Sequence, residues 1–424
     1  MAKQKQIEAI RLSDFPEEID EKTGLKFYGE TSYENQMAVL SQYLHNGSLE
    51  GNDTATKNQR EEIIAAILEF LERKKSQHSD FEYDLSEDFA SMVAENPGQY
   101  NLFEDFFNVP FPNPQRSKHT LIDLFAGIGG IRLPFNELGY KCVFSSEWDK
   151  FAQQTYFANF GEMPFGDITK ESTKKHIPQH FDLLLAGFPC QAFSIMGKMK
   201  GFDDIRGTMF FEVATILERH RPQAILLENV KQLTTHDHGR TFKTILRILD
   251  ELGYHVKWQV LNALDFGLPQ KRERVIIVGF QSQSQIDKFS FDFTKKPHSL
   301  EKVLEKDDEV APSLFASEMI LAKRKKQTEN KRVFYPSIWH ENKAGNVSIL
   351  DYACALRTGA SYNYLLVNGK RRPSSRELLR LQGFPDNYKI AVSHGEIRRQ
   401  TGNSVAVPMI REIAQKIDYI LNMN

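Results

Sequence analysis

The residues of this chain best suited to chemistry are a cysteine, a carboxylate and a glycine-rich turn, each placed after a short apolar run. Cys190 follows the run 183–186, Glu228 ends a second run, and the turn 126–130 follows a third. Such runs are typical of buried parallel strands, and open α/β sheets bind ligands at the carboxyl ends of their strands. A thiol and a carboxylate at one sheet edge suit nucleophilic attack beside a nucleotide-like cofactor.

The glycine-rich turn and a later acid predict a nucleoside site. Glycines let the backbone approach a ligand closely, and the following helix start offers free N–H groups to an anionic group. Glu147 lies twenty residues beyond Gly127, at the expected end of the second strand, where an acid binds ribose hydroxyls. Trp148 follows it and could stack on an adenine. The alternative is a plain glycine turn with a surface acid, because the G-x-G-x-x-G spacing is missing.

Among the three cysteines, Cys190 is the one predicted to react. Most single cysteines are small buried hydrophobes, and we expect this of Cys142 and Cys354. Cys190 instead precedes the glycine-rich stretch 194–207, whose glycines could be hinges of a closing lid and whose basic residues could meet phosphates. A thiolate in this position would be a nucleophile.

The buried acid and two arginines complete the expected cluster. A carboxylate at the depth of Glu228 is costly unless it is hydrogen-bonded, which favours a chemical task over the alternative of a loop cap. Arg272 and Arg274 precede the last clear strand, where dense charge usually indicates a solvated turn. They reach the same sheet edge only if that strand runs antiparallel.

Alternating strand and helix patterns between residues 121 and 280 predict an α/β fold with a parallel, doubly wound sheet. Strands are expected near 121–125, 142–146, 182–186, 224–228, 256–261 and 274–279. Helices are expected near 131–138, 150–159, 209–220 and 240–252. We assign residues 118–284 to this catalytic domain.

Residues 1–115 are predicted to form a separate, acidic and mainly helical extension. They hold 10 Lys and Arg against 22 Asp and Glu, a net charge of −12, whereas the remainder holds 44 against 34, a net +10. Helices are expected over 32–44, 59–73 and 86–95, with Asn58 or Thr56 capping the second. The proline-rich tract 110–114 is expected to be an extended linker.

The strand–helix alternation ends after residue 284. Lys and Arg cluster within 285–372, which we expect to be a small separate domain, and apolar helices at 375–381 and 405–421 indicate that 373–424 returns to the α/β domain. A basic catalytic portion suits a polyanionic partner, although each half could merely have its own solvated surface.

Composition excludes several classes of protein. The chain has 424 residues, 41% hydrophobic and 26% charged, with no apolar run of transmembrane length. Three scattered cysteines are too few for a disulfide framework or a zinc site. Nothing suggests a secretion signal, so we expect a cytoplasmic protein with no membrane partner and no metal.

In this order, the segments described above resemble the DNA (cytosine-5)-methyltransferases, particularly the bacterial restriction–modification and Dcm-like kind. The resemblance covers about residues 118–283 and 346–420. It rests on 123–130, 147–148, 167–168, 187–194, 228–230, 270–274, 376–385 and 402–405. It implies a Rossmann-like class I methyltransferase fold with a target-recognition domain in 285–372.

The resemblance further implies that S-adenosylmethionine is the methyl donor and S-adenosylhomocysteine the product. Glu147 would bind the ribose, Trp148 the adenine face, and Asp167 and Ile168 the adenine edge. The methionine part would be held by Phe125, Ala126, Gly127, Ile128 and Gly129. Pro189, Asn403 and Val405 would complete the pocket.

For the DNA, the resemblance implies that Cys190 attacks C6 of a flipped-out cytosine in duplex DNA. Glu228 would hold or donate a proton at N3, and Arg272 and Arg274 would steady the base. C5 would take the methyl group, after which loss of the C5 proton and of the thiolate regenerates the enzyme. Further DNA contacts are expected from Gln191, Ser194, Lys198, Arg206, Arg357 and Thr358.

Three alternatives stand beside this interpretation. A related subfamily methylates transfer RNA, although the bacterial-type motifs favour DNA. A catalytically silent nucleic-acid-binding regulator predicts damage at Cys190, Glu228 or the glycine turn, and none is visible. A Rossmann-like oxidoreductase lacks support from the glycine spacing.

The expected partners are double-stranded DNA and a cognate restriction endonuclease that acts on the same site, and we expect a monomer. The recognised DNA sequence does not follow from these residues. A charge of −12 argues against DNA binding by the extension, which we expect to be a packing or interaction domain.

Overall fold

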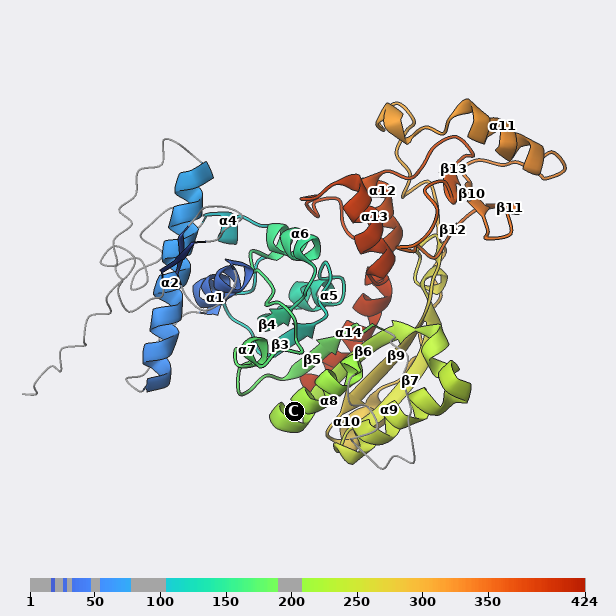
Figure 1. Cartoon of the computed structure of the whole chain (residues 1–424). Coiled ribbons are helices and arrows are strands. Elements are labelled where there is room, and N and C mark those ends of the chain that lie inside the picture. The colour runs from blue at the N-terminus through green and yellow to red at the C-terminus, as the bar shows by residue number, and fades with distance from the viewer. Residues whose placement is uncertain are drawn as a thin grey trace, which may run out of the picture.

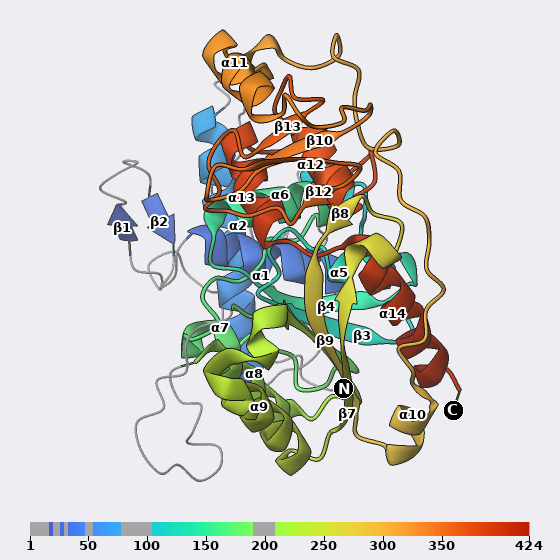
Figure 2. The ribbon, with the colours of Figure 1, turned by 90° about the vertical axis from the view of Figure 1, so that its right-hand side faces the viewer.

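The computed structural model describes residues 17–19, 26–28, 33–46, 54–77, 104–189 and 208–423. A six-stranded sheet of order β4-β3-β5-β6-β9-β7 lies at its centre (Figures 1 and 2). Its strands are β3 (Thr120–Leu124), β4 (Lys141–Ser146), β5 (Leu183–Ala186), β6 (Ala224–Val230), β7 (His255–Asn262) and β9 (Glu273–Phe280). Neighbours among β3 to β6 pair in parallel, and β9 pairs antiparallel with both β6 and β7. The predicted mostly parallel α/β sheet is therefore confirmed.

Helices cover both faces of the sheet because successive strand residues point to opposite sides. Leu183 and Leu185 join the core formed with α5 (Arg132–Glu137) and α14 (Val407–Leu421). Leu184 and Ala186 join the core formed with α8 (Met209–His220) and α9 (Arg240–Glu251). Near-continuous apolar runs are the expected signature of strands buried on both faces.

Buried residues of the N-terminal helices are part of this second core. α1 (Tyr33–Asn46) lies between the sheet and the long α2 (Thr54–Gln77), and α4 (Glu104–Phe107) follows (Figure 1). Because α2 begins at Thr54, Thr56 and Asn58 lie inside the helix, and the prediction that one of them caps it is wrong. The helix predicted at 86–95 lies outside the described residues. β1 (Glu17–Ile19) and β2 (Lys26–Tyr28) form an antiparallel pair.

Segment 285–372 builds a small sheet of its own, set apart from the central sheet in both ribbon views (Figures 1 and 2). Its order is β11-β10-β13 (Val347–Leu350, Ile338–Glu341, Leu365–Val367), with α11 (Glu318–Gln327) beside it and α10 (Gln283–Lys288) before it. β12 (Ala353–Cys354) pairs in parallel with β8 (Gln270–Lys271), which leads into β9. The domain boundaries themselves stay predictions.

The C-terminal segment carries α12 (Ser375–Gln382), α13 (His394–Asn403) and α14. Ser374 and Glu377 form a capping box at the start of α12. The sequence did not predict α13 or the short α7 (Glu171–Lys174), whereas α6 (Lys150–Phe160) was expected within one residue. Within the described ranges, no helix is both long and apolar enough to cross a membrane.

The burial of α14 predicts that the C-terminal segment is needed for folding. Ile413 of α14 is fully buried in the core beneath the sheet. Replacing Ile413 by Ala removes packed methyl groups and is expected to lower the free energy of unfolding by about 2–5 kcal/mol in chemical denaturation. Gln415→Ala, on the exposed side of the same helix, is the control and should change it by less than about 0.5 kcal/mol. Equal effects of the two changes would contradict this packing.

Candidate active site

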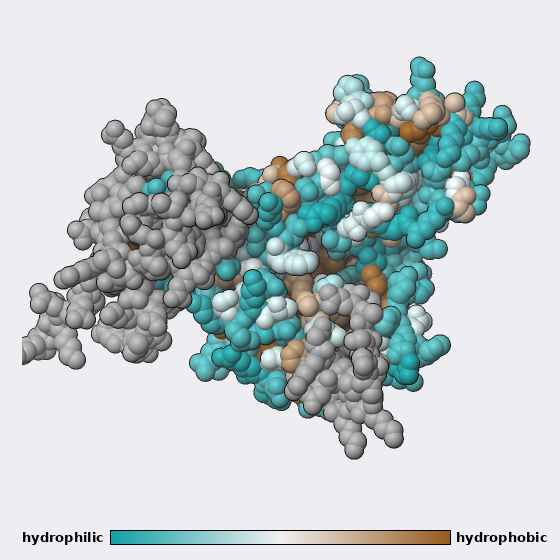
Figure 3. Space-filling view, viewed as in Figure 1, coloured by the Kyte–Doolittle hydropathy of each residue, from teal (hydrophilic) through white to brown (hydrophobic). Residues whose placement is uncertain are grey.

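A pocket of about 810 Å³ lies at the carboxyl ends of β3, β4, β5 and β6. This volume falls in the range typical of small-molecule and cofactor sites. The predicted cofactor residues that line it are Phe125, Ala126, Gly127, Ile128, Glu147, Trp148, Asp167, Ile168, Pro189, Asn403 and Val405. In Figure 3, hydrophobic residues lie in the recess between segment 285–372, at upper right, and the part of the molecule that contains the central sheet. Most of the described outer surface in that view is hydrophilic.

The glycine-rich turn has a backbone that few other residues could adopt. Gly127 and Gly129 have φ of +55° and +75°, values that favour glycine. A Cβ on Gly127 would meet nothing within 4 Å, whereas one on Gly129 would lie 2.2 Å from the ring of Phe160. Gly127 thus faces the pocket, and Gly129, which does not line it, allows α6 to pack closely against the turn.

Glu147 joins the ends of β3 and β4. One of its carboxylate oxygens accepts from Gly127 N–H at 2.8 Å and the other from Asp149 N–H at 2.9 Å. Burial raises the pKa of Glu147, while these backbone hydrogen bonds oppose the rise. Because each carboxylate oxygen has a further lone pair, Glu147 can still accept from two hydroxyl groups of a ligand.

An aromatic ring and an apolar side chain flank this acid. Trp148 is 82% exposed and lines the pocket, and Ile168 lines it as a buried apolar residue. Asp167 Oδ1 accepts from the N–H of Thr169 at 2.9 Å and from its hydroxyl at 2.8 Å. One carboxylate oxygen of Asp167 is thereby fixed, and the other is available to a ligand.

Glu228 lies at the floor of the pocket beside a partner arginine. Its carboxylate is 2.9 Å from Nε of Arg274, and the side chain is almost fully buried. Burial raises the pKa of Glu228, against the lowering effect of Arg274 and Arg272. β9 runs antiparallel to β6 and sets Arg274 opposite Val230. This is the strand direction that was required to bring Arg274 to this edge of the sheet.

Asn229 holds the chain that leads to Cys190. Its side-chain amide donates to the carbonyl of Phe188 at 2.8 Å, and its Oδ1 accepts from Val230 N–H at 2.8 Å. The end of β6 thus fixes the chain just before Pro189. Cys190 itself lies outside the described residues, as do Gln191, Ser194, Lys198 and Arg206.

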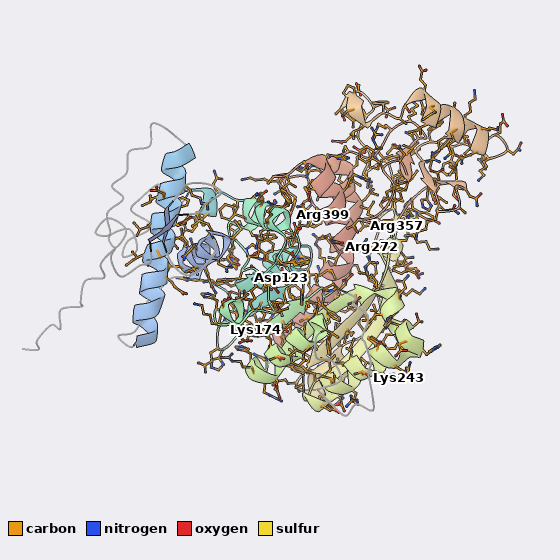
Figure 4. All side chains as sticks on the ribbon, viewed as in Figure 1. Asp123, Lys174, Lys243, Arg272, Arg357 and Arg399 are labelled. Atoms are coloured by element: carbon orange, nitrogen blue, oxygen red, sulfur yellow. The ribbon has the colours of Figure 1, made fainter. Side chains whose placement is uncertain are left out.

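Arg272 differs from its expected place. It is 1% exposed, does not line the pocket, and donates to the carbonyls of Leu356 and Gly402, each at 3.1 Å, and to that of Ser404. Figure 4 shows it close to Arg357, between the central sheet and segment 285–372. Its guanidinium is directed at backbone carbonyls and away from the pocket lining, which differs from the expected contact with a base.

An ion pair on one side of the pocket was not predicted from the sequence. Arg399 of α13 bonds to both carboxylate oxygens of Asp149, at 2.5 and 2.9 Å, and both residues line the pocket. Burial would raise the pKa of Asp149, but Arg399 and the N–H groups at the start of α6 lower it. Asp149 was recognisable as a helix cap, whereas Arg399 lies on a largely polar helix without a clear apolar pattern.

Arg357 lies in a second, basic cluster. Its guanidinium is 5.3 Å from the ring centre of Tyr364, and those of Arg372 and Arg398 are 4.4 and 4.6 Å from that of Tyr362. No carboxylate of the described chain forms an ion pair with any of these three arginines. Thr358, the next predicted DNA contact, packs so closely on Gly402 that a Cβ there would lie 2.7 Å from its backbone nitrogen.

The raised pKa of Glu228 predicts a pH-dependent cost in stability. A carboxyl group with a raised folded-state pKa favours the fold when protonated, and this contribution is lost as pH rises from 4.5 through the raised value. Glu228→Gln does not titrate, so its stability relative to the parent protein should increase as pH rises from 4 to 8. The gain should be about 1.4 kcal/mol for each pH unit that separates the folded-state pKa from the unfolded-state pKa. Chemical denaturation at several pH values measures this, and a constant difference would contradict a raised pKa.

Comparisons with known proteins identify the family of this chain. The sequence model of the C-5 cytosine-specific DNA methylase family matches residues 119–419. The chain is 56% identical over 309 residues to the Type II methyltransferase M.HaeII of Haemophilus aegyptius, covering 72% of this chain and 95% of that protein. It is 45% identical over 352 residues to the Type II methyltransferase M.HpaII of Haemophilus parainfluenzae, covering 77% and 96%.

Solved structures share the fold. The S. pombe Dnmt2 methyltransferase matches with a TM-score of 0.54 at 19% identity, covering 72% of this chain and all of that one. A putative DNA modification methyltransferase encoded within an E. coli prophage matches with a TM-score of 0.53 at 19% identity, with the same coverage. The family match over most of the chain, together with the identity to the two Type II methyltransferases, establishes that the protein belongs to the C-5 cytosine-specific DNA methylases.

Proposed function

We propose that this chain transfers a methyl group from S-adenosylmethionine to C5 of a flipped-out cytosine in a short, specific sequence of duplex DNA, through a covalent bond between Cys190 and C6. Family membership gives DNA cytosine methylation. The observation that carries the finer statement is one continuous pocket that joins the nucleoside-type site at Glu147 to the buried Glu228, with Pro189 on its lining next to Cys190.

The residues present fit S-adenosylmethionine. Glu147 offers acceptors for two ribose hydroxyls, Trp148 offers an exposed ring for the adenine face, and Ile168 adds an apolar contact. Asp167 would accept from the adenine edge, and the remaining predicted pocket residues would surround the methionine part. When bound, the cofactor supplies an electrophilic methyl group beside the substrate base.

The protein's own residues account for activation of the base. C5 of cytosine is a poor nucleophile, and attack by the Cys190 thiolate on C6 moves electron density to C5. Glu228, whose pKa is raised by burial, would hold a proton at N3 while the ring is negatively polarised. After methylation, loss of the C5 proton expels the thiolate and restores the aromatic ring. Arg274 would orient Glu228 through their ion pair.

The basic cluster is proposed to bind the DNA backbone. Arg357, Arg372 and Arg398 stack on Tyr364 or Tyr362. Guanidinium groups that form no ion pair with a carboxylate among the described residues suit phosphate oxygens. Flipping a base out of a duplex costs roughly a few kcal/mol, so firm backbone contacts near the pocket would help to offset it. The predicted contacts from Gln191, Ser194, Lys198 and Arg206 stay predictions.

The biological setting is also part of the proposal. Relatives carry the name Type II methyltransferase, which supports protection of DNA from a restriction endonuclease that acts on the same site. A monomer is expected because each methylation event concerns one base on one strand. Cytoplasmic location stays a prediction.

Loss of the thiol is expected to abolish the reaction. Cys190→Ala should show no methyl transfer from labelled S-adenosylmethionine to duplex DNA and an unchanged unfolding transition, because only the nucleophile is removed. Bisulfite mapping of DNA treated with the parent enzyme should place the label at a recurring cytosine. Transfer RNA and a sample without nucleic acid serve as controls, and methylation retained by Cys190→Ala would overturn the mechanism.

Removing one arginine of the basic cluster should weaken DNA binding only by the loss of a phosphate contact. Arg398→Ala is expected to lower affinity similarly for cognate and unrelated duplexes and to reduce the slope of log K against log salt by about 1. The matched control is Arg411→Ala, whose guanidinium pairs with Glu137, and it should leave the slope unchanged. Fluorescence anisotropy at several salt concentrations measures both. A loss confined to the cognate duplex would instead indicate a base contact.

A further inference from the structure

The N-terminal helix α1 lies directly against the loop that forms one wall of the cofactor pocket. This loop, residues 161–169, connects α6 to α7, and four of its residues line the pocket: Gly166, Asp167, Ile168 and Thr169. The family match begins only at residue 119, so α1 and α2 lie outside it. The relative M.HaeII is matched over 95% of its own length by 72% of this chain. The extension is thus an addition to the shared methylase fold.

Polar side chains of α1 satisfy backbone groups of this loop. Asn35 Oδ1 accepts from Gly166 N–H at 3.2 Å, and the hydroxyl of Ser41 accepts from Met163 N–H at 3.1 Å. Gln42 of the same helix donates to the carbonyl of Val143 in β4, not to the loop. α1 therefore binds both the sheet edge and the loop, through different residues.

Apolar packing places the same helix firmly. Met37 and Leu40 of α1 are buried in one continuous core with Phe144, Phe165 and Ile168. The rings of Phe144 and Phe165 stack with centres 5.1 Å apart. On the outer side, Glu62 of α2 pairs with Lys175 just after α7, at 2.5 Å.

The loop is fixed on its inner side by the end of β4. Phe165 N–H donates to the carbonyl of Ser145, and Glu147 N–H donates to the carbonyl of Phe165, both at 2.8 Å. The next residue, Gly166, is held from outside: a Cβ on it would lie 3.4 Å from Asn35 Oδ1. Gly166 is thus in contact with α1 on one side and lines the pocket on the other. A displacement of Asn35 would reach Asp167 through one peptide unit and Ile168 through two.

From this arrangement we propose that the extension is a built-in brace of the cofactor site and that Asn35 is a positioning residue for cofactor binding. Asn35 fixes the Gly166 backbone and so pre-organises the Asp167–Ile168 wall before the cofactor arrives. The inference rests on the proposed function because it concerns the same pocket. It gives the acidic extension a role that requires no contact with DNA, in keeping with its net charge of −12 over residues 1–115.

The test compares four variants for binding of S-adenosylhomocysteine by calorimetry and for methyl-transfer kinetics. Asn35→Ala removes the acceptor for Gly166 N–H and is expected to weaken cofactor binding and raise its KM about three- to tenfold, the range of one lost hydrogen bond. Because the brace acts on binding, kcat at saturating cofactor and affinity for DNA should not change. Asn35→Asp keeps an acceptor oxygen at the same position and should recover part of the binding that Asn35→Ala loses.

Gln42→Ala is the matched control, because it truncates an amide on the same helix that contacts β4 but not the loop. Hydrogen exchange of the Gly166 amide gives a readout independent of turnover and should accelerate in Asn35→Ala but not in Gln42→Ala. Glu147→Ala reports on the pocket itself and should weaken the cofactor more than Asn35→Ala does.

Three results would overturn the proposal. Equal losses in Asn35→Ala and Gln42→Ala would show that α1 contributes only general stability. Unchanged binding in Asn35→Ala, with a clear loss in Glu147→Ala, would refute the brace and leave the proposed function intact. Unchanged binding of S-adenosylhomocysteine in Glu147→Ala would refute the assignment of this pocket to the cofactor and, with it, both proposals.

Discussion

The site depends on one constraint: two distant parts of the chain must meet at one short segment, where the buried polar side chains of Gln270 and Arg272 hold them. The Gln270 side chain donates to the carbonyl of Leu381 and accepts from Leu356 N–H. Arg272 donates to the carbonyls of Leu356, Gly402 and Ser404. Segment 285–372 and the C-terminal helices are thereby fixed to the strand that carries Arg274. Because such buried groups are costly when left without partners, this junction has few alternative arrangements.

Around this junction, the chemistry is divided between strand ends and returning segments. The carboxyl ends of β3 to β6 supply the glycine turn, Glu147, the approach to Cys190, and Glu228. The C-terminal segment adds Arg399 on Asp149 and completes the pocket with Asn403 and Val405. The N-terminal extension contacts another part of the pocket wall, at Gly166, through Asn35. A cofactor in this pocket would therefore contact walls that are supported by two segments outside the central α/β unit, the C-terminal segment and the N-terminal extension.

Much of this arrangement could be predicted from the sequence, because apolar runs and turn residues are local signals. The six strands of the central sheet and the helices predicted between them, α5, α6, α8 and α9, lie within a few residues of the predicted positions. Most of the expected cofactor residues line one pocket. Local signals failed where tertiary contacts determine the burial of a side chain. Arg272 has the sequence context of a solvated turn, yet its side chain is fully buried. The polar helix α13 and the contact of Asn35 with Gly166 carry no periodic pattern that could reveal them.

In the proposed mechanism, Cys190 forms a covalent bond to C6 of cytosine during methyl transfer. The most direct measurement uses duplex DNA in which 5-fluorocytosine replaces the target cytosine, with S-adenosylmethionine present. Fluorine at C5 cannot leave as a proton does, so the thiolate cannot be expelled after methylation and the adduct should persist. We expect mass spectrometry to find one DNA adduct per enzyme, on the peptide that contains Cys190. An adduct on Cys142 or Cys354, or methylation of ordinary cytosine with no adduct on the fluorinated DNA, would contradict the mechanism.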